Sequence, residues 1–306
     1  MPEPRGARVA HYALGLAGLI AAAVMARHSD VGALRAFGPW AVFAVAVEGL
    51  RVVAEALATR ALVGGTVPWG PLLRAHAAGY ALAMTMPAGR SVAEAAKATM
   101  LAPWIGAGRS VGVAATNQSL VMASTGAVAL ACAVPAAALG HANLARAVVL
   151  QGVALVAFGG ALLATVRSPA VAAWVGAKLP RLAAMAGGAS EGARAPGVPQ
   201  AAGWFAAHRL VQGVQLFAML AAVGRPDPVV AASLLGASII GTSVGVAVPG
   251  QLGAVGASLA LAAPGLGVSA PVALSMALVI HAAQLAWVIV GLAVWAVVRR
   301  RSVSVE

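Results

Sequence analysis

The sequence predicts an all-α integral membrane protein with six full spans and two re-entrant helical hairpins, arranged as inverted repeats. Of its 306 residues, 61% are hydrophobic and only 9% are charged, whereas a soluble domain carries about 25% charged residues. Several stretches exceed the roughly 18 apolar residues that suggest a spanning helix. No strand-like alternation accompanies them. We therefore expect residues 1–306 to form a single polytopic membrane domain.

Six continuous apolar segments are expected to cross the bilayer as helices. They are residues 9–26, 37–62, 111–138, 143–166, 203–223 and 270–298. The first begins like a signal peptide, with charged residues ahead of an apolar core. Because the rest of the chain is also membrane-like, we interpret this segment as an uncleaved first span.

Two further apolar regions, 71–105 and 229–264, are each broken in the middle by proline and glycine. Proline removes a backbone donor and clashes with the preceding turn, and glycine permits a sharp reversal. Each half is too short to cross alone, which favours re-entrant hairpins surrounded by protein or a water-filled cavity. The predicted turn residues are Pro87, Gly89, Pro249, Gly250 and Gly253.

The positions of arginine and lysine predict the orientation in the cell inner (cytoplasmic) membrane. Arg5 and Arg8 precede the first span, and three arginines at 299–301 follow the last. The longest polar segment, 167–201, is also basic, so we expect this loop and both termini to be cytoplasmic. Full-spanning hairpins would give the same sidedness. The formal charge of +12 therefore indicates membrane orientation and not nucleic-acid binding.

An internal repeat links the two broken regions. Pro87 and Pro249 differ by 249 − 87 = 162 positions, and at that offset "PAGRSVAEA" aligns with "PGQLGAVGA". Repeat one covers about 37–138 and repeat two about 203–298, each with a span, a hairpin and a long span. One hairpin would open inside and the other outside, an inverted arrangement typical of transporters. The alternative is chance similarity between two Ala/Gly-rich segments.

Glu48, Arg51 and Glu55 lie on the second span at spacings of three and four, which places them on one helical face. A charge at the bilayer centre costs about 2.5–3.5 kcal/mol on insertion scales, so such groups face a partner or a cavity. Two interpretations stay open. The three residues form either a self-neutralising ion-pair ladder or a polar wall along a substrate path.

Arg90, Glu94 and Lys97 follow the first break at positions i, i+4 and i+7. In one interpretation they lie at the interface, where long basic side chains snorkel to water. In the other, Arg90 and Lys97 meet an anionic headgroup beside a helix N-terminus. The coincidence of proline, glycine and charge favours the second. From the other half of the chain, the predicted substrate-binding residues are Arg209, Gln251 and His281.

No catalytic or cofactor motif stands out. The chain has one cysteine, Cys132, and neither an HExxH motif nor a Gly-rich phosphate loop ahead of a helix. We therefore expect no metal, no cofactor and no enzymatic activity.

The two broken segments carry a family resemblance. "PAGRSVAEAAK" (87–97) and "PGQLGAVG" (249–256) resemble motifs of the transmembrane region of lysylphosphatidylglycerol synthases and their stand-alone flippase-like relatives. The family's second glutamate is Gly256 here, and its arginine on the last helix is His281. The resemblance implies a lipid translocator or another lipid-handling membrane protein, and not the synthase, whose activity needs a separate soluble domain.

The function expected is that of a flippase-like lipid transporter that translocates an amphiphile with an anionic, phosphate-bearing headgroup. The expected partner is a membrane lipid with such a headgroup, and a homo-oligomer or an envelope-biosynthesis partner fits as well. Two alternatives stay open. One is a membrane enzyme that modifies a lipid headgroup, and the other is an accessory scaffold in envelope lipid or glycan biosynthesis.

Overall fold

The computed structural model describes residues 16, 20–86, 88–179, 183–248, 251 and 253–303. Within these residues the regular structure is helical, as the sequence predicts. The predicted first span, 9–26, lies mostly outside the described residues. The described stretch 20–28, which overlaps its end, is helical. Pro87, Pro249 and Gly250 also lie outside them.

In the part of the chain that the structure describes, three helices are long and apolar enough to cross a membrane. They are α6 (Ala107–Ala138), α7 (Ala142–Arg167) and the stretch Ala270–Val297 of α13 (Ala270–Val303). Their positions agree with the predicted spans at 111–138, 143–166 and 270–298. Two further helices, α3 (Ala41–Val63) and α10 (Val198–Ala222), occupy the predicted segments 37–62 and 203–223. Because both helices contain polar and charged residues, they are less apolar than the three helices named first.

The first proline-glycine break separates α4 (Trp69–Thr85) from α5 (Gly89–Ile105), and these two helices pack against each other as a hairpin. Ala88 adopts a left-handed conformation with φ of 49°, which a non-glycine residue adopts only at an energetic cost. At Gly89, an added Cβ would collide with the backbone carbonyl of Ala83. The hairpin therefore requires glycine at the first residue of α5.

The second break follows α11 (Pro228–Val244) and a short 3-10 turn, Gly245–Ala247. Gln251 and Gly253 both have positive φ, 55° and 86°, and α12 (Ala254–Ala262) then returns along α11. With nine residues, α12 is much shorter than α5. Another 3-10 turn, Pro264–Leu266, ends the hairpin before α13 begins.

Residues 167–201, expected as a loop, instead contain two helices, α8 (Pro169–Lys178) and α9 (Ala183–Ala193). Ser168 caps α8 by accepting a hydrogen bond from the Val171 amide, and Pro169 occupies the first helical position. Alanine, the best helix former, is frequent in both helices. Because each helix is shorter than a membrane span, hydropathy alone did not reveal them.

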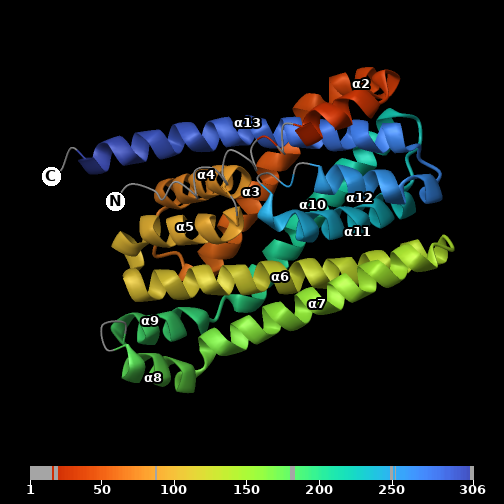
Figure 1. Ribbon diagram of the computed structural model, residues 1–306. Coiled ribbons are helices and arrows are strands. Elements are labelled where there is room, and N and C mark those ends of the chain that lie inside the picture. The colour runs from red at the N-terminus through yellow and green to blue at the C-terminus, as the bar shows by residue number, and fades with distance from the viewer. Residues whose placement is uncertain are drawn as a thin grey trace.

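The two hairpins enter from opposite ends of the molecule, between α13 on one side and α6 on the other (Figure 1). Their tips meet near the middle, where α5 contacts the 3-10 turn Gly245–Ala247. A short helix, α2 (Val31–Phe37), lies beside α13. The order of elements is the same in both halves: a helix, a hairpin and a long helix, as α3–α6 and again as α10–α13.

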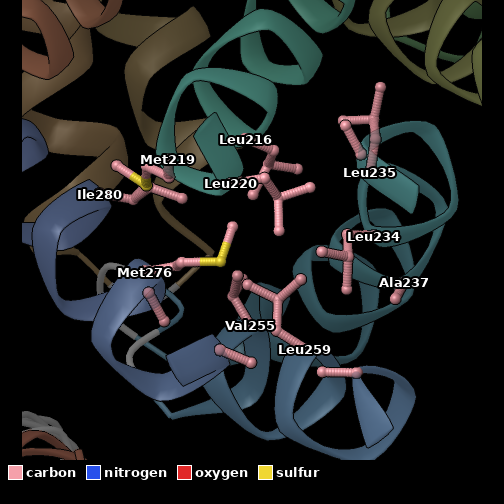
Figure 2. Close-up of a cluster of buried hydrophobic side chains, with 14 of the residues drawn as sticks. Leu216, Met219, Leu220, Leu234, Leu235, Ala237, Val255, Leu259, Met276 and Ile280 are labelled. Atoms are coloured by element: carbon pink, nitrogen blue, oxygen red, sulfur yellow. The ribbon is translucent and has the colours of Figure 1, made fainter. Parts of the chain in front are cut away.

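Apolar side chains hold the second hairpin between α10 and α13 (Figure 2). Leu216 and Leu220 of α10 face Leu234 of α11, and Met276 of α13 lies beside Val255 of α12. A separate apolar cluster, which includes Leu62, Leu72 and Phe205, joins α3, α4, α6 and α10 around the first hairpin. Most of the charged residues discussed below lie at the meeting point of the hairpins.

Candidate functional site

A cavity of about 370 Å³ lies where the two hairpins meet. The first hairpin contributes Gly89 and Arg90 at the start of α5, and the second break contributes Val246, Val248 and Gln251. Helices α3, α6, α7, α10 and α13 complete the wall. This volume lies within the range of small-molecule sites, about 300–1,000 Å³.

Almost all of the predicted substrate-binding residues face this cavity. They come from α3, α5, α10, α13 and the second break, and they are Glu48, Arg51, Glu55, Arg90, Lys97, Arg209, Gln251 and His281. The remaining predicted residue, Glu94, is buried behind the wall and contacts Arg90 and Lys97. The structure thus brings residues from distant segments to one place.

Glu48 and Arg51 form a buried ion pair on α3, with Arg51 Nη1 2.7 Å from Glu48 Oε2. Tyr80 of α4 donates its hydroxyl to Glu48 Oε1 at 2.6 Å. His208 of α10 contacts Arg51 through both ring nitrogens, Nε2 to Nη2 at 3.1 Å and Nδ1 to the backbone carbonyl at 3.1 Å. Because arginine only donates, these contacts assign a neutral His208 that accepts at Nε2 and donates from Nδ1.

A second group of charges joins α5 to α3. Arg90 Nη1 lies 2.6 Å from Glu55 Oε1, and Arg90 Nη2 lies 3.5 Å from Glu94 Oε1. Lys97 Nζ contacts the same Glu94 oxygen at 2.6 Å. Lys97 is only 4% exposed, so its side chain points into the protein and not outward to the interface. The snorkelling interpretation is therefore wrong for Lys97.

Arg209 of α10 makes a different set of contacts. Its Nε donates to Thr125 Oγ1 of α6 at 3.0 Å, and its Nη1 donates to Gln212 Oε1 at 3.1 Å. Gln212 in turn donates to Ser238 Oγ of α11 at 3.4 Å. Neutral side chains from three helices thus position this buried guanidinium at the cavity wall.

His281 of α13 contacts Gln284 on its own helix, with Nδ1 2.8 Å from Oε1. Its Nε2 is buried and has no hydrogen-bond partner within the described part of the chain. Gln118 of α6, another cavity residue, likewise has a buried Oε1 without a partner. Both side chains line the cavity, but these two atoms are themselves enclosed by protein.

Tyr80 and Thr125 were not among the predicted site residues, although both line the cavity. Tyr80 carried a usable signal, because it is one of only two tyrosines in the chain and a buried phenol usually needs a hydrogen-bond partner. Thr125 carried none, since a threonine in a membrane helix often bonds to its own backbone. Behind the cavity, Thr59 contacts His76 and Asn117 at 2.9 Å each, which links α3 to α4 and α6.

Comparison with known proteins gives one match. A family model described as the lysylphosphatidylglycerol synthase TM region matches residues 10–293. The matched segment contains both hairpins and all residues that line the cavity. No curated protein and no solved structure matches the chain significantly.

Proposed function

The chain belongs to the lysylphosphatidylglycerol synthase transmembrane-region family, and on this basis we propose that it translocates an amphiphile with an anionic, phosphate-bearing headgroup across the inner membrane. One observation carries the proposal: the tips of two helical hairpins line a single polar cavity inside an otherwise apolar protein. A charged headgroup cannot cross hydrocarbon without a large cost, so its translocation requires such a polar site.

Helix lengths support the proposed topology. At 1.5 Å per residue, α3 and α10 are about 34 and 37 Å long, enough for a hydrocarbon core of about 30 Å. By the same measure α4, α5 and α11 reach about 25 Å and α12 about 14 Å. We propose that these four helices form re-entrant hairpins. The predicted first span (9–26), α3, α6, α7, α10 and α13 would then cross the bilayer, with both termini and residues 167–201 cytoplasmic.

The entry of the hairpins from opposite ends supports an inverted repeat (Figure 1). Transporters with inverted repeats bind their substrates where broken helices meet near the bilayer midplane. In this protein the corresponding place is the cavity. We propose that its polar lining, with Arg90, Lys97, Arg209, Gln251 and His281, receives the headgroup while the acyl chains remain in lipid.

The experiment that tests translocation is a scrambling assay in proteoliposomes, with fluorescent phosphatidylglycerol and an impermeant quencher. Vesicles that contain the protein should lose more fluorescence than protein-free vesicles. Val246→Trp should reduce this activity, because Val246 is 56% exposed and lines the cavity. The matched control is Val244→Trp, since Val244 is 74% exposed and does not line it.

Activity no greater than in protein-free vesicles would contradict the proposal. A protein that binds the lipid without moving it would instead be an accessory scaffold or a headgroup-modifying enzyme. Equal effects of the two tryptophan substitutions would separate translocation from this cavity.

A further inference from the structure

The carboxylates that line the cavity or lie directly behind its wall each contact a basic side chain. Glu48 contacts Arg51, Glu55 contacts Arg90, and Glu94 contacts both Arg90 and Lys97. Three carboxylates therefore neutralise three basic side chains. The Arg90/Glu94/Lys97 group, taken with Glu55, carries no net charge.

Arg209 is the basic side chain at the cavity that has no carboxylate partner among the described residues. It is 9% exposed and lines the cavity, and within the described residues no carboxylate lies within 4 Å of it. Its two recorded hydrogen bonds go to the uncharged Thr125 and Gln212. A buried charge without a counter-ion is costly, so such groups normally have a charged partner. An anionic ligand that enters the cavity would supply the counter-ion that the described part of the protein does not provide.

We propose that Arg209 is the residue that binds the phosphate of the headgroup, an inference that rests on the proposed function. A guanidinium has five N–H donors, and the protein occupies two of those of Arg209. The remaining three can form a fork onto phosphate oxygens, which arginine does better than lysine. One unmatched positive charge balances one negative charge, so the preferred ligand is a phosphodiester monoanion.

The surrounding contacts prepare Arg209 for this task. Thr125 holds Nε from α6, while Gln212 holds Nη1 and is itself bonded to Ser238 of α11. A side chain that is already fixed loses little conformational freedom when a ligand binds. Arg90 and Lys97, which the sequence also favours as headgroup ligands, line the same cavity but are already paired with Glu55 and Glu94.

The test measures binding of a soluble short-chain phosphatidylglycerol to the purified full-length protein, with phosphatidylcholine of the same chain length for comparison. Arg209→Gln should weaken phosphatidylglycerol binding by roughly 10- to 100-fold, as expected for loss of a charged hydrogen-bond partner. Arg74→Gln is the control, because Arg74 is exposed and does not line the cavity. It should leave the affinity unchanged.

A second substitution neutralises Arg209 without removing it. Gln212→Glu places a carboxylate at the position that now accepts from Arg209 Nη1 at 3.1 Å. This variant should lose phosphatidylglycerol affinity to a similar extent while its melting temperature rises, because a lone buried cation gains a partner. Simple misfolding would lower the melting temperature instead. If Arg209→Gln fails to fold, Gln212→Glu decides the question.

The outcomes separate the two proposals. A wild-type protein that binds phosphatidylglycerol no better than phosphatidylcholine would contradict the proposed function, and the role of Arg209 with it. A wild-type protein that prefers phosphatidylglycerol, while Gln212→Glu retains full affinity, would overturn only the assignment to Arg209.

Discussion

Glu55 of α3 contacts Arg90 at the start of α5, with Oε1 2.6 Å from Nη1. The same oxygen lies 3.7 Å from His208 Nδ1 of α10. This carboxylate thus joins α3 to the tip of the first hairpin. This contact fixes the position of the hairpin tip that lines the cavity.

The Glu55–Arg90 pair should show strong energetic coupling. Glu55→Gln and Arg90→Gln should each lower the free energy of unfolding by about 1–3 kcal/mol. We expect values in the lower part of this range, because the Arg90 side chain is 25% exposed and water screens its interaction with Glu55. The double substitution should cost less than the sum, since neither charge is then left alone. Unfolding in detergent measures all three variants, and strictly additive losses would contradict the coupling.

Where α7 packs against α6, α7 should tolerate alanine at Gly160 but not at the neighbouring Gly159. At Gly159 an added Cβ would lie 2.6 Å from the Ser119 carbonyl oxygen, whereas at Gly160 it would meet nothing within 4 Å. Gly159→Ala should therefore destabilise the protein by about 1–3 kcal/mol. Gly160→Ala should be neutral or stabilising by up to about 1 kcal/mol, because alanine favours helices. Equal melting temperatures for the two variants would refute this close packing.

The start of α7 and helix α9 should be accessible from opposite sides of the membrane. Cys132 is the only cysteine and is buried, so Cys132→Ala provides a background for single-cysteine variants. In intact cells, an impermeant maleimide should label Asn143→Cys, while Glu191→Cys should react only after the membrane is opened. Both positions are exposed in the protein. Labelling of Glu191→Cys from outside would reverse the orientation.

Helix α8 should lie in the membrane interface. It is apolar along most of its length but buries none of its residues, and Trp174 is 62% exposed. Tryptophan is typical of the interface between lipid and water. A spin label at Trp174→Cys should collide frequently with oxygen, which concentrates in lipid, whereas a label at Glu191→Cys should collide with a water-soluble relaxant. Water-like behaviour at both positions would exclude contact between α8 and lipid.

The helix breaks were predictable because proline and glycine act locally. The backbone turns at Ala88 and Gln251 lie within the two predicted interruptions. Ion pairs within one helix, such as Glu48 with Arg51, also follow from spacing alone. In contrast, the contact between Glu55 and Arg90 joins residues 35 positions apart. Such a contact depends on how helices pack, which the sequence pattern does not specify.

The positions of the charged residues on α3 also constrain the order in which the helices can enter the membrane. Glu48 obtains its tyrosine partner 32 residues later, and Glu55 obtains Arg90 35 residues later. The contact between Arg51 and His208 spans 157 residues. While α3 leaves the ribosome these partners do not yet exist, and exposure of its charges to lipid would be costly. We therefore expect the insertion machinery to retain α3 until α4 and α5 have emerged, so that the first hairpin releases the helix into the bilayer.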